Sequence, residues 1–288
     1  MVYAIIGFGL LTCLDSAIKY ATGTFPVMQV AFLRFFIGML VAGIALVFFR
    51  PGWPSREMVL ANGSRSLLGA ITGVTFFYAL SVLPLGETIA LSFVAPIYIA
   101  LLGALILGEK LDRRIGLALA AGFLGMLIIV GGRIGSASYS EHALWGVGAV
   151  LLAGLTYALS TVLLRQRAQT DPVLTIIFFQ ALGPALVLAV PAWFAWQPVP
   201  AASWPLFMLL GLLGFSGHYF LTNAFAREEA GRLAPLEYTA LIWAAALGFF
   251  IFHEVPQLTT LAGALLIVAG AVLTGRKQKG PGTPALDD

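Results

Sequence analysis

Charged residues are scarce in this sequence. Of its 288 residues, 10% are charged and 60% are hydrophobic, whereas a soluble domain has about 25% charged residues. So few charges could not cover a water-facing surface, which excludes an ordinary soluble globular protein. The composition predicts a polytopic membrane protein, and the length suits one compact bundle of about ten spans of roughly 20 residues each.

Cysteine and histidine are also nearly absent. Cys13 is the only cysteine, so the chain cannot form an intramolecular disulfide, and Cys13 alone cannot make a metal site. The three histidines (His142, His218 and His253) form no HExxH or Ser-His pattern, and no Walker lysine loop occurs. We therefore expect no cofactor, no metal and no ATP hydrolysis. A membrane-embedded enzyme and a non-transporting sensor or scaffold are the less favoured alternatives.

The formal net charge of +3 could suggest a nucleic-acid partner, but no basic and aromatic residues alternate in a soluble stretch. Basic residues beside membrane spans explain the charge instead. Thirteen of the 16 lysines and arginines fall on one side of the predicted spans, Lys19 and Arg133 fall on the other, and Arg34 lies within a span. By the positive-inside rule both termini are cytoplasmic, in a cell (inner) membrane.

An apolar stretch at Leu83–Glu109 recurs at Glu228–Glu254. Gly86, Gly103 and Glu109 recur 145 residues later as Gly231, Gly248 and Glu254. A repeat of this length predicts two homologous halves. We place them at residues 1–133 and 143–275, with a disordered cytoplasmic tail at 276–288. Each half would hold five spans, so the second is inverted, and such repeats bind substrate near the midplane.

The motifs of both halves resemble one family of membrane proteins. The first half has Pro26 and Arg34 in its second span, Tyr78-Ala79-Leu80 in its third, and Pro96 with Gly108-Glu109 in its fourth. The second copies are Asp171-Pro172, Asn223-Ala224-Phe225 and His253-Glu254. With the length and the repeat, these motifs resemble the EamA-type branch of the drug/metabolite transporter superfamily, and within it most closely the exporters of aromatic and other amino acids.

The resemblance implies a fold and a mechanism. It implies an all-α membrane protein of ten transmembrane helices, built as two inverted five-helix repeats around a central cavity. Helices 1, 3, 4, 6, 8 and 9 would surround the cavity, helices 2 and 7 would act as gates, and helices 5 and 10 would pack at the periphery. Leu241 replaces Pro96 and Gln180 replaces Arg34 in the second copy, so the two halves differ chemically.

Four residues are candidates for gating or coupling. Asp15 and Arg34 both lie roughly 9–12 Å deep and could pair as a structural ion pair, a gate or a substrate carboxylate anchor. Pro96 would allow its helix to bend. Glu237 lies about two turns into the ninth span, where it could be a protonatable coupling residue or a structural residue.

The candidates for substrate binding are aromatic or polar residues on the helices that would line the cavity. Each could instead serve helix packing, which is the commoner role of such residues. Aromatic side chains could stack on an apolar substrate and offer a polar group. These candidates are Tyr78, Phe93, Tyr98, Tyr157, His218, Asn223, Tyr238 and Trp243.

The sequence therefore predicts a secondary-active or facilitative exporter of small metabolites, most favourably amino acids including aromatic ones. Export of drugs or other metabolites is the alternative. The partners expected are a small amphipathic substrate and the lipid bilayer, and a monomer is compatible with the compact bundle. Proton coupling and facilitated diffusion remain equally open at this point.

Overall fold

The computed structural model describes residues 2–50, 55–107, 113–132, 141–165, 172–227 and 239–275. Within these ranges every regular element is helical. The elements are α1 (Val2–Thr22), α2 (Val27–Phe49), α3 (Arg56–Val82), α4 (Leu85–Ser92), α5 (Ala95–Leu107), α6 (Arg113–Gly131), α7 (Glu141–Arg165), α8 (Val173–Phe194), the short 3₁₀ turn η1 (Ala201–Ser203), α9 (Trp204–Arg227), α11 (Thr239–Phe252) and α12 (Leu258–Gly275).

The helices have the length and apolarity that a bilayer requires. In the described ranges, 7 helical stretches are long and apolar enough to cross a membrane, and three shorter apolar helices accompany them. A helix pairs its backbone N–H and C=O groups internally, which a spanning segment must do because the hydrocarbon core holds no water. The predicted all-helical membrane fold is confirmed.

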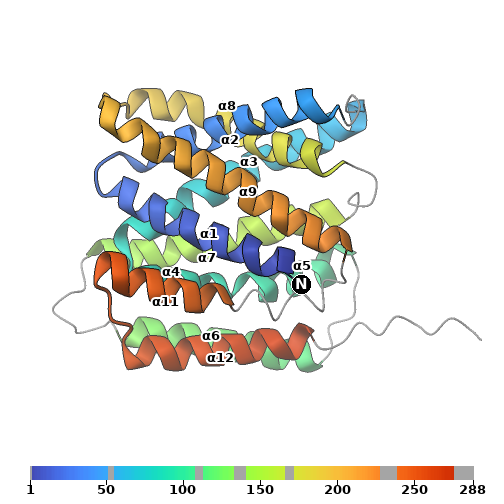
Figure 1. Ribbon diagram of the computed structural model, residues 1–288. Helices are drawn as coiled ribbons and strands as arrows, with labels where there is room; N and C mark the ends of the chain where they lie inside the picture. The colour runs from blue at the N-terminus through green and yellow to red at the C-terminus, as the bar shows by residue number, and fades with distance from the viewer. Residues whose placement is uncertain are drawn as a thin grey trace, which may run out of the picture.

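Figure 1 shows the helices stacked in layers, and each layer combines a helix of the first half with the helix one repeat later. From top to bottom the layers are α2 with α8, α3 with α9, α1 with α7, α4 and α5 with α11, and α6 with α12. The contacts between layers also occur in equivalent pairs. The α3–α7 contact corresponds to α1–α9, and α2–α9 corresponds to α3–α8. The packing therefore has an internal two-fold pattern.

The start of α2 meets the end of α8, which shows that these equivalent helices run in opposite directions. Gln29 Nε2 donates to the carbonyl of Gln197 across 2.8 Å, and Gln197 N donates back to Gln29 Oε1 across 2.9 Å. Gln29 is fully buried, and both ends of its amide are used in this pairing. A buried amide satisfied in this way fixes the relative position of the two helices.

The apolar stretch at 83–109 is not one continuous helix, and its break lies next to Pro96. The structure divides it into α4 and α5, with a break at Phe93 and Val94. Pro96 has no N–H to donate to the carbonyl of Ser92, so the regular hydrogen-bond ladder cannot continue there. Instead the N–H of Val94 bonds to the Leu91 carbonyl at 3.2 Å, in a tighter three-residue step. The span is therefore discontinuous near its middle.

The third span begins at Arg56. Ser55 caps this helix, because its Oγ accepts from the N–H of Met58 across 3.2 Å. Such a cap satisfies one of the N–H groups that a helix start leaves unpaired. The predicted linker between the halves, residues 133–142, lies mostly outside the described residues.

Candidate functional site

Arg34 is a charged side chain buried inside the bundle. It is 7% exposed, and its guanidinium carbon lies 4.1 Å from the centroid of the Phe35 ring. Its Nη2 lies 3.3 Å from Nε2 of His218 on α9. Gly214 leaves room for it, since a Cβ at Gly214 would lie 3.2 Å from Arg34 Nε. A charge in this position is costly, which makes the site a functional candidate.

The hydrogen bond between Arg34 and His218 has a defined direction. A guanidinium has donors only, so Nε2 of His218 must accept, and the neutral imidazole then carries its hydrogen on Nδ1. Within the described structure, Arg34 Nε has no hydrogen-bond partner. The site therefore has more donors than acceptors.

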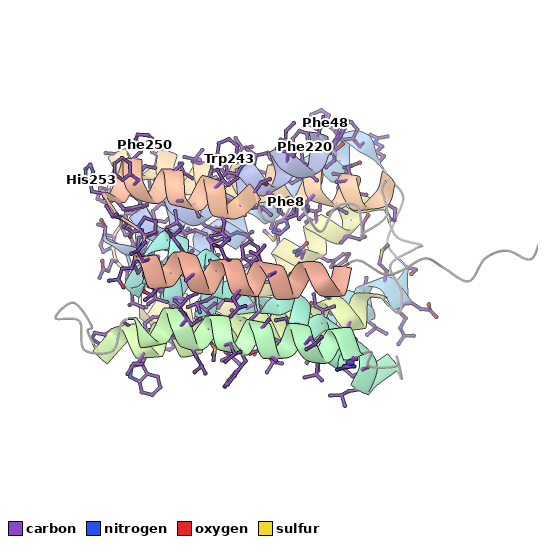
Figure 2. All side chains as sticks on the ribbon, turned by 90° about the horizontal axis from the view of Figure 1, so that it is seen from below. Phe8, Phe48, Phe220, Trp243, Phe250 and His253 are labelled. Carbon is purple, nitrogen blue, oxygen red and sulfur yellow. The ribbon has the colours of Figure 1, made fainter. Side chains whose placement is uncertain are left out.

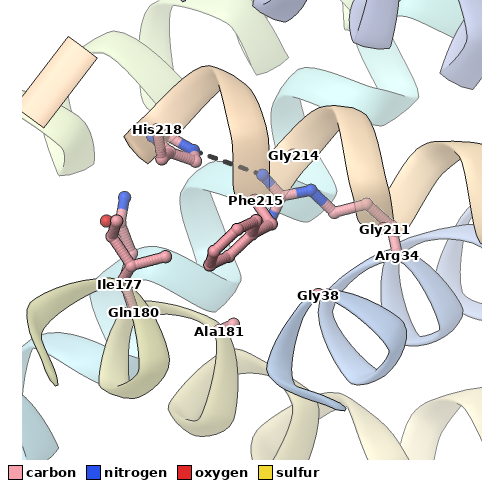
Figure 3. A pocket seen from close by; sticks show the side chains of 9 residues that line it. All are labelled: Arg34, Gly38, Ile177, Gln180, Ala181, Gly211, Gly214, Phe215 and His218. Carbon is pink, nitrogen blue, oxygen red and sulfur yellow. Dashed lines mark hydrogen bonds between the residues drawn. The ribbon is translucent and has the colours of Figure 1, made fainter. Parts of the chain in front are cut away.

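A narrow pocket lies beside Arg34, at the junction of α2, α8 and α9. It has an empty volume of about 270 Å³, which includes the part open to the outside. Figure 3 shows Arg34 entering from α2, His218 from α9 and Gln180 from α8, with the ring of Phe215 drawn between Gln180 and Arg34. The lining residues are Arg34, Gly38, Ile177, Gln180, Ala181, Gly211, Gly214, Phe215 and His218.

Gln180 is the repeat equivalent of Arg34, and both line this pocket. Equivalent positions can meet only near the axis that relates the two halves. The sequence predicted this equivalence after a one-residue shift, but it did not predict that the two side chains share a pocket. His218, predicted as a substrate contact, is brought to the same place.

Asp15, the predicted partner of Arg34, is half-buried on α1. The charges of Asp15 and Arg34 interact electrostatically. In the described part of the chain, however, no ion pair within 4.0 Å joins the two side chains. The direct polar partner of Arg34 is His218, so Asp15 acts on Arg34 through space.

The break between α4 and α5 positions two of the predicted aromatic residues. Phe93 caps α4 and is 3% exposed. Tyr98 lies one turn after the break. Its ring packs against Gly154 of α7, and a Cβ built at Gly154 would lie 3.5 Å from this ring. Pro96, predicted as a bending point, lies between them in the sequence.

Tyr157 lies on the inward face of α7 but is exposed. Val150 and Ala153, which precede it on the same helical face, are 0% and 3% exposed. Tyr157 is 47% exposed. The face of α7 that is buried at Val150 and Ala153 is therefore exposed at Tyr157.

The remaining candidates lie apart from the Arg34 pocket. The indole of Trp243 lies against α1 at Gly9, and Figure 2 shows Trp243 and Phe250 along the same outer edge of α11. Asn223 Nδ2 donates to the Tyr219 carbonyl of its own helix across 2.9 Å. Tyr78 is half-buried on α3. Glu237 and Tyr238 lie outside the described residues.

A second cluster of charges, partly buried, closes the end of the bundle where α1 ends, which we call the Lys19 end. Lys19 Nζ lies 3.2 Å from Glu254 Oε1 and also donates to the carbonyls of Leu80, at 3.1 Å, and Leu83. Glu254 Oε2 accepts from the N–H of Leu85 across 2.7 Å, at the start of α4. This Lys19–Glu254 cluster joins α1, α3, α4 and α11.

The local backbone explains how Glu254 reaches the cluster. His253 has a left-handed conformation, with φ of 56°, and its N–H bonds to the Phe249 carbonyl at 3.1 Å. This turn ends α11 and reverses the chain. The carboxylate of Glu254 also suits the positive end of the α4 dipole.

The two ends of the bundle differ in their packing. At the Lys19 end, α1 packs against α3. The equivalent helices of the second half are α7 and α9, and their described residues make no comparable contact. The exposed ring of Tyr157 and the exposed amide of Gln180 agree with this difference. Among the described residues, the bundle is closed at the Lys19 end and less closely packed at the opposite end, where Figure 1 marks the N-terminus.

Comparison with known proteins relates this arrangement to a family. The model of the EamA-like transporter family matches the chain twice, at residues 2–131 and at residues 144–276. The chain belongs to this family. In the described residues of this EamA-like transporter, no group of three or more histidines, cysteines or carboxylates could hold a metal ion.

Named relatives of this EamA-like transporter carry different solutes. The pseudopaline exporter CntI of Pseudomonas aeruginosa strain PAO1 is 32% identical over 96% of each chain. The S-adenosylmethionine uptake transporter of Rickettsia prowazekii is 24% identical over 88% of this chain and 84% of its own. One solved crystal structure has the same fold, with a TM-score of 0.65, 24% identity and coverage of 95% of this chain and 96% of that one.

Sequence reasoning missed two polar contacts in this EamA-like transporter. From the sequence, Lys19 and Arg65 counted only as basic residues on opposite sides of the membrane. Arg65 instead donates from Nε to Ser160 Oγ of α7 across 3.3 Å, and Ser160 is the repeat equivalent of Asp15. The offset of 145 residues could have drawn attention to Ser160. Nothing in the sequence pairs Lys19 with Glu254.

Proposed function

We propose that this EamA-like transporter moves small amphipathic metabolites by alternating access, with substrate bound between the Arg34 pocket and the broken α4–α5 span. The observation that carries this proposal is the difference between the two ends of a bundle with two-fold packing. The end closed by Lys19 and Glu254 corresponds to an open end at Tyr157. Exchanging these two arrangements would move a central site from one side to the other.

The proposal assigns roles to the two halves. Residues 1–133 and 143–275 are the two inverted units, and one rocks against the other. Residues 276–288 form a tail. Pro96 supplies the flexible point in the first half, where the second half has Leu241. Because α2 and α8 meet at equivalent positions, we assign them as gating helices.

The membrane orientation follows from the distribution of basic residues. The side that holds most lysines and arginines is the cytoplasmic one, which puts both termini in the cytoplasm. The Lys19 end then faces the outside, and the more open end at Tyr157 faces the cytoplasm. In a bacterial inner membrane this arrangement would collect substrate from the cell interior, as an exporter must.

For the substrate we propose amino acids, including aromatic ones, as the first class to examine. Tyr78, Phe93, Tyr98 and Tyr157 supply rings for an apolar side chain, and the proposal keeps Asn223, Tyr238 and Trp243 as further contacts and Glu237 as a coupling residue. The second candidate is a metallophore-like metabolite, because the relative that shares 32% identity exports pseudopaline. S-adenosylmethionine is a third substrate to include, because of the uptake transporters among the relatives.

Counterflow in proteoliposomes tests the proposal. Vesicles with purified protein are loaded with one unlabelled solute at a time, and the entry of labelled L-phenylalanine or labelled S-adenosylmethionine is followed. Entry that depends on the internal amino acid supports an amino-acid carrier. Entry of S-adenosylmethionine alone favours S-adenosylmethionine or a related metabolite over amino acids as the substrate.

A matched control keeps the test specific. Protein-free vesicles and vesicles with a Tyr157→Ala variant are measured in parallel. Tyr157→Ala should reduce entry of phenylalanine more than entry of alanine, because a ring contact is lost. If neither amino acids nor S-adenosylmethionine exchange, and cationic drugs and nucleobases do not exchange either, the proposed carrier function is wrong.

A further inference from the structure

We propose that the pocket between α2, α8 and α9 binds a carboxylate, so that the transported metabolite is a carboxylic acid held by Arg34, His218 and Gln180. This inference rests on the proposed function and adds the chemical class of the group that the carrier recognises. It also gives Gln180, the neutral equivalent of Arg34, a role in binding.

The donors around the pocket favour an anion. Arg34 Nη2 is used by His218, while Arg34 Nε is buried with no partner in the described structure. His218 carries its remaining hydrogen on Nδ1, as the direction of that bond requires. Gln180 adds an amide with two more donors. A carboxylate has only acceptors when ionised, and a guanidinium with a second donor beside it is the arrangement that binds it most strongly.

The lining of the pocket contains no acidic side chain. The nearby carboxylate is that of Asp15 on α1, which interacts with Arg34 from outside this lining. In its ionised form Asp15 offsets part of the charge of Arg34 when the pocket is empty. A bound carboxylate would share Arg34 with Asp15, so the two anions compete for one guanidinium.

The depth of the pocket indicates whether the bound anion comes from a solute or from a lipid headgroup. Arg34 is the eighth residue of α2 and Gln180 the eighth of α8, and the two helices run in opposite directions. Each residue then lies about 10 Å from the start of its helix, which places the pocket near the centre of a hydrocarbon core about 30 Å thick. Headgroup phosphates lie outside this core. The anion must therefore come from a solute.

The size of the pocket limits what it holds. Its empty space of about 270 Å³ includes the part open to the outside, so the enclosed part is far smaller than the range of about 300–1,000 Å³ that holds a whole small ligand. Only a small polar group, such as one end of a metabolite, could enter it. The apolar remainder would extend from the pocket toward the aromatic residues of the proposed path.

Direct binding tests the inference without transport. Purified protein is titrated with acetate, benzoate and L-phenylalanine, and with their neutral amides, and binding is followed by the shift in melting temperature. At least one carboxylate should bind at least tenfold more tightly than its amide. Arg34→Gln should remove this preference, and Asp15→Asn should strengthen carboxylate binding by removing the competing charge.

Two further variants guard against simple unfolding. Gln180→Glu keeps Arg34 and adds a negative charge at the pocket, so it should weaken carboxylate binding at an unchanged melting temperature. Arg56→Gln removes an exposed charge at the start of α3 and should change nothing. Equal binding of acids and amides, no binding of any of them, or a preference that survives Arg34→Gln overturns the inference.

The outcome separates this inference from the proposed function. A carboxylate preference without counterflow of any solute would reject the carrier and retain the anion site. Counterflow that accepts L-phenylalanine and L-phenylalaninamide equally would retain the carrier and reject the anion site.

Discussion

Buried charged side chains in this transporter are stabilised in different ways. Lys19 has a carboxylate and two carbonyls around it, so its charge is fully compensated. Arg34 has one histidine, one aromatic ring and the carboxylate of Asp15, with which it forms no direct ion pair. A buried charge with incomplete compensation costs stability, and proteins retain such groups mainly where they serve a function. By this criterion we assign Arg34 to the proposed binding site and Lys19 to a structural contact between helices.

The hydrogen bond from Thr260 to Glu87 gives a prediction for stability. Thr260 Oγ1 donates to Glu87 Oε1 across 3.1 Å, both residues are 3% exposed, and the bond joins α12 to α4. Thr260→Val keeps the shape and removes the donor. A hydrogen bond to a charged group contributes about 1.5–3 kcal/mol, so the free energy of unfolding should fall by about that amount. Unfolding in mixed detergent micelles measures it.

Thr161→Val is the matched control for this prediction. Thr161 Oγ1 donates to the Tyr157 carbonyl of its own helix, and the bond is exposed. Its loss should cost less than about 0.5 kcal/mol, as for most exposed substitutions. If both variants lose the same stability, the bond between α12 and α4 contributes no more to the free energy of unfolding than the exposed bond of Thr161 does.

At the scale of helices, glycine sets how closely α6 and α12 approach. A Cβ at Gly125 would lie 2.6 Å from the Gly263 carbonyl oxygen, and a Cβ at Gly263 would lie 2.5 Å from the Gly125 carbonyl oxygen. Neither backbone can move without separating the helices. Small residues at such crossings are typical of membrane helices, where close packing replaces the hydrophobic effect as the source of association.

Gly125→Ala should therefore destabilise the bundle. Overpacking of this kind costs about 1–3 kcal/mol. Gly116 lies on the same helix with no atom within 4 Å of its Cβ position. Gly116→Ala should be neutral or stabilise by up to about 1 kcal/mol, because alanine favours a helix. Melting temperatures of the two variants test the contrast, and a similar loss in both would contradict it.

The Lys19–Glu254 cluster gives a prediction about opening. Lys19→Met removes the ion pair and the bonds to the α3 carbonyls, each of which helps to close the Lys19 end. A loss of about 1.5 kcal/mol would raise the open population about tenfold. In a Cys13→Ala background with Tyr78→Cys as reporter, an impermeant thiol reagent added from that side should label about tenfold faster.

Exchange of the two charges should not restore closure. In a Lys19→Glu, Glu254→Lys double variant, a carboxylate would face the α3 carbonyls and an ammonium would face the start of α4, where the helix dipole repels it. Labelling should stay fast. Slow labelling in the exchanged variant would mean that the ion pair alone closes this end. Glu57→Gln, an exposed change at the other end, should leave the rate unchanged.

The sequence predicted the fold better than the site, for physical reasons. Apolar runs and the 145-residue offset depend on local composition, so the ten spans and the equivalence of Arg34 with Gln180 were accessible. The break at Phe93 was only suggested by Pro96, because a proline can bend a helix without dividing it. The contacts of Lys19 and Arg65 depend on how distant helices pack, and no local pattern encodes that packing.

At the scale of the whole molecule, the two-fold packing permits two arrangements while the sequence selects one. Lys19 has Leu164 as its repeat equivalent, so the cluster that closes the Lys19 end has no identical counterpart. The two halves also differ in their packing. Helix α1 packs against α3, whereas the described residues of α7 and α9 make no comparable contact. Under the proposed alternating access, the Lys19 end would open and close once in each cycle.

Covalent closure of the Lys19 end should therefore stop transport. The tips of Lys19 and Glu254 lie 3.2 Å apart, so cysteines at both positions can be joined by a short bifunctional thiol reagent in the Cys13→Ala background. Counterflow should fall to the level of empty vesicles after linking and recover after cleavage of the link by a reductant. Each single-cysteine variant, treated in the same way, should keep its rate. A linked protein that still exchanges substrate at the unlinked rate would show that this end need not open, and alternating access across this bundle would have to be abandoned.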